Sequence, residues 1–156
     1  MIQNTPNRTP ERVRHELRFR KLNVQQVQQI TPHLLRVVLE GPELQDFQSA
    51  SFDDHCKLIF PDVQTGTLIT PQVTAEGITW PEGPRPATRD YTPHSFDEEK
   101  QTLSFDFVLH EAGPATAWAL KAKKGDILGV GGPRGSFIIP AAYDWYLLAG
   151  DDTALP

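Results

Sequence analysis

Short apolar runs that end at proline or glycine divide this chain into segments too brief for long helices. The chain contains 14 prolines, and proline ends helices and is kept to the margins of sheets. The clearest run alternates apolar and polar residues over 103–109, the period of a strand with one buried face. Further runs cover residues 16–29, 34–39, 55–60, 127–130 and 137–139. The pattern predicts a mainly β protein, built as a six-stranded antiparallel Greek-key barrel.

One segment has the composition of a helix. Residues 115–123 are dominated by alanine and leucine, and Pro114 suits the first turn. Lysines near the end of the segment complement the helix dipole before Gly125 stops the helix. We therefore expect the barrel to carry one short helix.

Charge and cysteine content limit the classes of function. The net charge of −5 argues against a nucleic-acid surface, and no apolar run reaches the roughly 18 residues of a membrane span. The one cysteine, Cys56, excludes an intrachain disulfide and lies in an apolar run. We expect a buried thiol and a cytoplasmic protein. No cluster of histidine, cysteine or carboxylate has metal-ligand spacing, so no metal site is predicted.

The two ends of the chain differ from its centre. Residues 1–15 are polar and show no periodicity, so we expect an N-terminal tail. Residues 16–142 would form the barrel domain, with strand fragments in a long loop over 61–86. Residues 145–149 are continuously apolar, like a strand buried on both faces, and run into Gly150 and a helix-starting sequence. An α/β nucleotide-binding unit begins in this way, so we expect residues 143–156 to be the first strand and turn of a truncated second domain.

Arg89, Tyr91 and Thr92 place a cation, an aromatic ring and a hydroxyl within four residues. Arginine can clamp a phosphate with two N–H groups, and Tyr91 shares the strand face of Arg89 and can lie against a ring. Thr92 would reach the same ligand only if the backbone turns, which Pro93 encourages. Taken alone, the motif also fits a surface arginine, a core tyrosine and a turn threonine.

A second motif opens the predicted helix. His110 ends the alternating strand, and Gly113, Pro114, Ala115 and Thr116 follow. Glycine permits the close approach of a phosphate, and the first amides of a helix are unpaired donors at the positive end of its dipole. Thr116 adds a hydroxyl, although an ordinary first-turn threonine and a structural histidine would look the same. Together the two motifs predict a site for a phosphate-bearing aromatic cofactor, which we interpret as a flavin.

In this order and spacing, the motifs resemble the flavin-binding barrel of the ferredoxin-reductase superfamily. The neighbouring sequence narrows the resemblance to the siderophore-interacting protein family. Members of that family are FAD-containing, NAD(P)H-dependent ferric-siderophore reductases. The segments that carry it are DHCKLIFP at 54–61, RDYTP at 89–93, DFVLH at 106–110, GPA at 113–115, GVGGPRGS at 129–136 and GDDTALP at 150–156.

The resemblance implies roles for individual residues. Arg89 would pair with the first phosphate of FAD, Tyr91 would pack on the isoalloxazine, and Thr92 would bond the ring edge. The other implied cofactor contacts are Asp106, Val108 and His110 along their strand, and Gly113, Pro114, Ala115 and Thr116 at the diphosphate. Lys57 would belong to a basic patch that attracts an acidic ferric siderophore, with a plain strand-edge lysine as the alternative.

The implied reaction is electron transfer from NAD(P)H through FAD to siderophore-bound Fe(III), and it needs no acid, base or nucleophile from the chain. Two other functions stay open. One is a flavin reductase or electron-transfer flavoprotein of the same superfamily with another acceptor; the other is a β-barrel ligand-binding module without redox chemistry. The choice of siderophore, the choice between NADH and NADPH, and the oligomeric state also stay open at this point.

Overall fold

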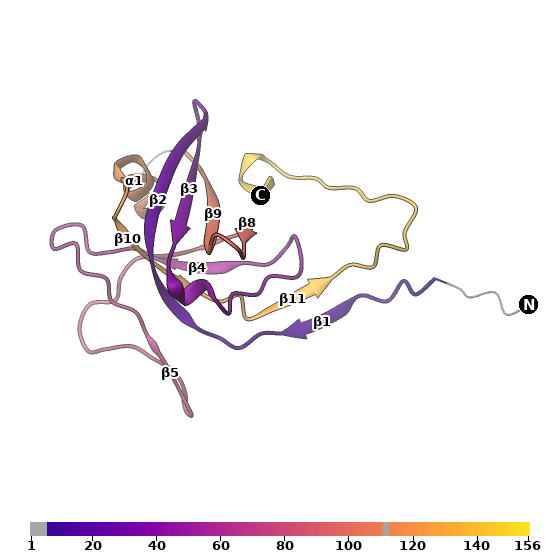
Figure 1. The fold of residues 1–156 in the computed structure, drawn as a ribbon, viewed down its shortest axis with the longest axis horizontal. Helices are drawn as coiled ribbons and strands as arrows, with labels where there is room; N and C mark the ends of the chain where they lie inside the picture. Colours follow the sequence, from indigo (N-terminus) through magenta and orange to yellow (C-terminus); the bar gives the residue numbers. More distant parts are fainter. Residues whose placement is uncertain (1–5, 111–112) are drawn as a thin grey trace, which may run out of the picture.

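The computed structural model of the chain describes residues 6–110 and 113–156 (Figure 1). They form a sheet-rich body with one α-helix and two short 3-10 helices, η1 (Pro42–Leu44) and η2 (Asp152–Ala154). The mainly β architecture predicted from the short apolar runs is confirmed. The first five residues of the predicted tail lie outside the described part. Within the described ranges, no helix has the length and apolarity needed to cross a membrane.

Seven strands form the main sheet. In order across the sheet they are β7 (Thr88–Tyr91), β4 (Cys56–Ile59), β10 (Ile127–Gly131), β2 (Phe19–Thr31), β3 (Leu34–Glu40), β9 (Thr102–Val108) and β8 (Pro93–Asp97). Every neighbouring pair is antiparallel. The runs predicted at 16–29, 34–39, 55–60, 103–109 and 127–130 correspond to β2, β3, β4, β9 and β10.

The main sheet is curled, because its two edge strands are neighbours in the sequence. β7 ends at Tyr91 and β8 begins at Pro93, so Thr92 alone separates them. Consecutive Cα atoms are about 3.8 Å apart, whereas the edges of a flat seven-stranded sheet would lie roughly 30 Å apart. The sheet therefore bends into a half-barrel whose edges meet at Thr92 (Figure 1). The motif of Arg89, Tyr91 and Thr92 lies at this seam.

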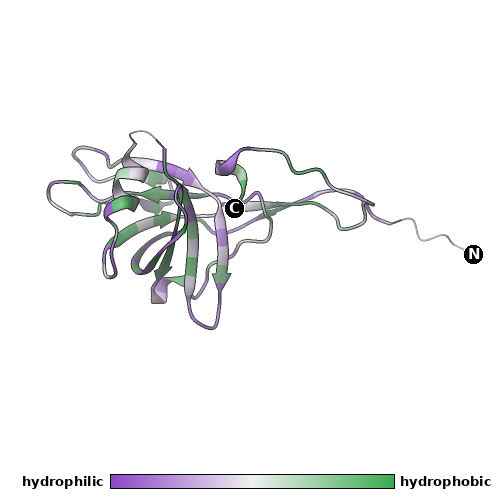
Figure 2. Ribbon diagram, turned by 90° about the horizontal axis from the view of Figure 1, so that it is seen from above, coloured by the Kyte–Doolittle hydropathy of each residue, from purple (hydrophilic) through white to green (hydrophobic). Residues whose placement is uncertain are grey.

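Apolar side chains from alternate strand positions fill the inside of the curl. In β3 every second residue is buried, as one-sided packing requires. In β9, Leu103, Phe105 and Phe107 belong to the core. Cys56 is also fully buried there, and burial raises the pKa of its thiol, so it packs as the small hydrophobe that the sequence predicts. Figure 2 shows hydrophobic residues (green) along the strands of this body.

Two small sheets lie outside the main one. β1 (Glu11–Arg14) pairs with β11 (Gly135–Ile138), and together they form an arm that extends from the body (Figures 1 and 2). β5 (Gln72–Thr74) and β6 (Gly77–Thr79) form a hairpin, in keeping with the strand fragments predicted over 61–86. β1 lies inside the predicted tail. Its partner strand is far away in the sequence, so the local pattern does not show the pairing.

The helix α1 (Pro114–Lys121) lies where the sequence predicts it and packs against β9. Gly113 is its N-cap in an extended conformation, and Pro114 occupies the first turn. The ring of Trp118 lies 5.8 Å from both the Phe60 and Phe107 rings, measured between centroids. This aromatic packing holds the helix on the core.

The C-terminal apolar segment differs from its prediction. Residues 145–149 contain no strand and pair with none of the described strands, and Trp145 is 76% exposed. A strand buried on both faces needs a neighbour on each, and the described elements supply neither. Beyond this segment, η2 turns back and contacts β9.

Candidate functional site

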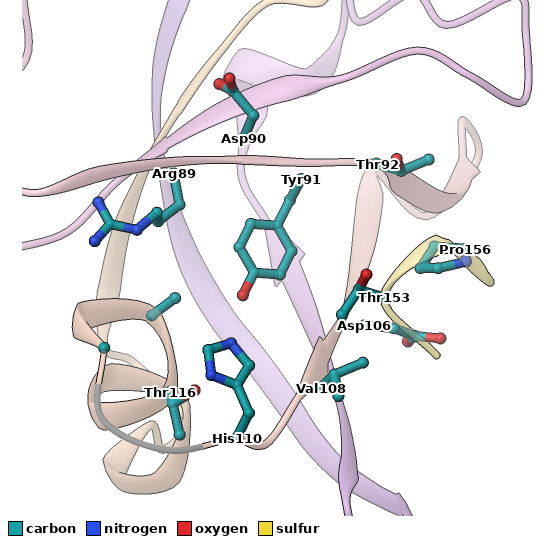
Figure 3. Close-up of a pocket in the computed structure, with 12 residues that line it drawn as sticks. Arg89, Asp90, Tyr91, Thr92, Asp106, Val108, His110, Thr116, Thr153 and Pro156 are labelled. Carbon is teal, nitrogen blue, oxygen red and sulfur yellow. The ribbon is translucent and has the colours of Figure 1, made fainter. Parts of the chain in front are cut away.

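β7, β9 and the N-terminus of α1 surround a cavity of about 240 Å³, which we call the Tyr91 cavity (Figure 3). Its lining residues are Arg89, Asp90, Tyr91, Thr92, Asp106, Val108, His110, Gly113, Ala115, Thr116, Thr153 and Pro156. All of the predicted cofactor residues except Pro114 are among them. Three separate segments of the chain therefore bring the two sequence motifs to one place.

β7 directs alternate side chains to opposite sides of the sheet. Figure 3 shows Arg89 and Tyr91 on one side of the strand and the Asp90 carboxylate on the other, as strand geometry requires. The Arg89 side chain is exposed, and its Nη1 donates to the Thr88 carbonyl oxygen at 2.7 Å. This contact uses one of the several N–H groups of the guanidinium, and the others can reach a ligand.

Tyr91 supplies an aromatic floor to the cavity. Its ring packs on Phe107 with centroids 4.6 Å apart and planes inclined by 35°. Burial raises the pKa of the Tyr91 phenol, and the nearby Arg89 charge opposes this shift in part. The phenol is therefore a neutral hydrogen-bonding group at physiological pH. Because Phe107 belongs to the core, the position of the Tyr91 ring is set by the packing of the half-barrel.

Asp106 forms part of the β9 wall, but its carboxylate already has a partner. Arg36 on β3 donates to both of its oxygens, from Nε at 2.7 Å and from Nη2 at 2.9 Å. His94 Nδ1 lies 3.5 Å from the same group. The carboxylate raises the pKa of the Arg36 guanidinium, mainly through this bidentate hydrogen bond. The ion pair of Arg36 and Asp106 thus connects β3 with β9 beneath the cavity.

The N-terminus of α1 offers donors for an anion. The first amides of a helix have no partner within the helix, and its dipole favours negative charge there. A Cβ added to Gly113 would meet no described atom within 4 Å, so there is open space beside the turn that leads into the helix. Thr116 is 7% exposed, and among the described residues its Oγ1 has no hydrogen-bond partner. A buried hydroxyl without a partner is costly, and a phosphate oxygen in the cavity would satisfy it.

The structure also places residues that the motifs do not explain. Pro114 faces a separate cavity on the other side of α1, beside Trp118. Thr153 and Pro156 line the Tyr91 cavity because η2 folds back toward β9. Nothing in the local sequence indicates that return. Figure 3 shows the His110 ring pointing into the space between Tyr91 and Thr116.

Lys57 lies on β4, opposite Asp90 of the neighbouring strand β7. It lines a second cavity of about 290 Å³, which we call the Lys57 cavity. Its residues are Leu17, Phe19, His55, Lys57, Ile78, Trp80, Asp90, Gly131 and Arg134. Lys57 Nζ forms an exposed ion pair with Asp90 at 2.7 Å. Arg134 has no ion-pair partner in the described part of the chain. Asp90 lines both cavities, so one strand separates them.

Comparisons with known proteins agree with this geometry. The family described as siderophore-interacting FAD-binding domain matches residues 23–137. An NADPH-dependent ferric-chelate reductase of Escherichia coli (strain K12) is 48% identical over 155 residues, which cover 99% of this chain and 60% of that protein. A ferric vibriobactin reductase of Vibrio cholerae is 37% identical over 128 residues, which cover 81% of this chain and 47% of that protein.

A solved structure gives the same picture. The siderophore utilization protein from T. fusca has a TM-score of 0.79 and 39% sequence identity to this chain, and the match covers 85% of this chain and 51% of that one. The chain thus spans 60% or less of the length of each of these three proteins.

Proposed function

Because the chain belongs to the siderophore-interacting FAD-binding domain family, we propose that it is the flavin-binding part of an NAD(P)H-dependent reductase of ferric siderophores. The Tyr91 cavity carries this proposal. It joins a cation, an aromatic ring, a helix N-terminus and the Thr116 hydroxyl, which has no hydrogen-bond partner among the described residues. These groups match the phosphates and the ring of FAD.

Different residues of the Tyr91 cavity would contact different parts of the cofactor. Arg89 pairs with a phosphate from the β7 side, while the amides of Ala115 and Thr116 and the Thr116 hydroxyl bind the diphosphate from the helix side. Gly113 and Pro114 shape that turn. Tyr91 packs on the isoalloxazine. Thr92 at the seam bonds the ring edge, and Asp106, Val108 and His110 form the wall along β9. Bound FAD would supply the electron transfer from the pyridine nucleotide to the ferric chelate.

The substrate is proposed to bind on the opposite side of β7. Among the described residues, Lys57 and Arg134 outnumber Asp90, the one carboxylate in the lining of the Lys57 cavity, and the net positive charge would attract an acidic ferric siderophore. Asp90 connects this cavity with the Tyr91 cavity. Only the strand β7 would then lie between the flavin and the iron chelate. The names of the Escherichia coli and Vibrio cholerae relatives support a ferric chelate as the substrate.

The finer architecture is also part of the proposal. β7 pairs with β4 and β8 pairs with β9, with Thr92 alone between them. We propose that β7 and β8 act as one strand bent at Thr92, which makes the seven-stranded sheet equivalent to a six-stranded Greek-key barrel of the ferredoxin-reductase type.

The domain limits form a further part of the proposal. Residues 1–15 precede the barrel domain of 16–142, and residues 143–156 begin an NAD(P)H-binding domain. The exposed apolar side chains of Trp145, Leu147 and Leu148 support this assignment, because such side chains are normally buried. A cytoplasmic location suits the buried, free thiol of Cys56.

Two linked measurements test the proposal on this chain alone. The first is titration with FAD, followed by quenching of flavin fluorescence. The second is anaerobic reduction of the bound flavin with dithionite, followed by mixing with a ferric catecholate and trapping of Fe(II) with ferrozine. A chemical reductant replaces the pyridine nucleotide, so the test does not depend on a second domain.

The expected result is saturable FAD binding, with iron reduced faster than by the same concentration of free reduced flavin. Arg89→Ala should bind FAD roughly 10- to 100-fold more weakly, so at an FAD concentration that just saturates the wild type its rate should fall toward that of free flavin. A chain that binds no FAD, or that reduces iron no faster than free flavin, would contradict the proposal.

A further inference from the structure

The lining of the Lys57 cavity includes large side chains that the charge argument does not use. Besides the cationic side chains it contains Phe19, Ile78 and Trp80, which are apolar or aromatic. A site for a small anion needs only cations and hydrogen-bond donors. A wall of large apolar groups beside cations instead fits a ligand that is both anionic and flat.

Two of these side chains come from the hairpin. Ile78 lies on β6, and Trp80 follows the end of that strand. β5 and β6 pair with each other and form a sheet separate from the main one (Figure 1). Ile78 is 43% exposed although it is apolar. The hairpin therefore brings a hydrophobic surface to the cavity without being part of the core.

The Trp80 ring is held in place from one side. The Arg85 guanidinium lies 5.6 Å from the centroid of the ring, a cation–π contact that also adds positive charge close to the cavity. Gly131 makes room for the Phe19 ring, since a Cβ on Gly131 would lie 2.6 Å from an atom of that ring. Both aromatic rings of the cavity are thus positioned by specific neighbours.

We propose that Trp80 is a specificity-determining residue, whose indole stacks on an aryl group of an anionic iron chelate. The inference rests on the proposed function and names the class of siderophore. A ferric catecholate carries aromatic rings and net negative charge, so it matches both the aromatic and the cationic groups of the lining. A ferric hydroxamate with aliphatic arms and no net negative charge matches neither.

Binding of redox-inert gallium(III) chelates tests this without any flavin chemistry. Calorimetry on the whole chain would compare the gallium complex of 2,3-dihydroxybenzoate with gallium desferrioxamine B. We expect tighter binding of the catecholate. Trp80→Leu should weaken that binding by about tenfold and leave the hydroxamate unchanged. Trp80→Phe should keep most of the affinity. Trp145→Leu is the matched control, because Trp145 is exposed and lies outside both cavities.

The outcomes distinguish a failure of the proposed substrate from a failure of the role of Trp80. A wild-type chain that binds neither chelate would overturn the proposed substrate and the role of Trp80 together. Wild-type binding that Trp80→Leu leaves unchanged, or an equal loss for both chelates, would overturn only the role of Trp80. FAD titration of the same variant should be unaffected, which shows that the fold is intact.

Discussion

The two sides of β7 are built in different ways. On the Arg89 and Tyr91 side, the cavity is lined by β9 and α1, and its Tyr91 floor rests on the core residue Phe107. On the Asp90 side, the cavity is lined by exposed charged residues and by the hairpin of β5 and β6. On the proposed function, the cavity built on the core would hold the cofactor and the cavity beside the hairpin would hold the substrate. One strand could serve both, because its side chains alternate between the two sides.

The largest difference should appear in stability. Phe107 is fully buried and contacts both Tyr91 and Trp118. Phe107→Ala should lower the free energy of unfolding by about 3–5 kcal/mol, because it leaves a cavity in the core. Trp80→Leu should cost about 1 kcal/mol or less, since its hairpin is separate from the main sheet. Urea denaturation compares them, and Phe107→Leu serves if the alanine variant does not fold. Equal losses would show that the hairpin is part of the core.

Two arginines should differ in their effect on FAD. Arg89→Ala would remove the proposed charge-assisted hydrogen bond to a phosphate, so FAD binding should weaken by about 1.5–3 kcal/mol, or roughly 10- to 100-fold. Arg134→Ala removes an equal charge from the Lys57 cavity and should leave FAD affinity unchanged. Fluorescence titration measures both. If Arg134→Ala weakens FAD binding as strongly as Arg89→Ala, the effect is one of overall charge and the two sites are not separate.

Thr116 should show opposite effects on stability and binding. Its buried hydroxyl has no partner among the described residues, so Thr116→Val should keep or raise the unfolding free energy of the FAD-free chain, by up to about 1 kcal/mol. FAD binding should weaken by about 1 kcal/mol, or roughly fivefold. Thr88→Val, on β7 but outside both cavities, is the control. A valine variant with lower stability and unchanged FAD affinity would mean that the hydroxyl is structural.

The smallest effects concern the exposed ion pair of Lys57 and Asp90. Exposed pairs are worth about 1 kcal/mol or less. Asp90→Asn frees Lys57 and should tighten binding of gallium dihydroxybenzoate by a few-fold, while Lys57→Gln should weaken it by a similar factor. Both effects should shrink as salt is raised. Changes of the same sign in the two variants would rule out competition between Asp90 and the chelate for Lys57.

The same contrast explains how much the sequence could predict. Part of the lining of the Tyr91 cavity follows from local rules: strand alternation sets Arg89 and Tyr91 on one side, and the helix start sets Gly113 and Thr116. The return of η2 to this cavity does not. Most strands of the main sheet follow from the same alternation. The role of Lys57 follows from the resemblance to the siderophore-interacting proteins and not from a local pattern.

The rest depends on contacts between distant segments. Arg134 and Trp80 come close to Lys57 only in the folded chain. No local sequence pattern predicts that they line the same cavity. β1 needs β11 to be recognised as a strand. The apolar residues 145–149 have strand composition, but they lack a partner among the described strands and remain exposed. Composition shows what a segment prefers, while its neighbours decide what it forms.

The most direct measurement is a crystal structure of the chain with FAD. The account predicts the diphosphate between the Arg89 guanidinium and the N-terminus of α1, with Thr116 Oγ1 bonded to a phosphate oxygen and the isoalloxazine against Tyr91. FAD bound elsewhere, or a bound diphosphate that touches neither Arg89 nor α1, would contradict it.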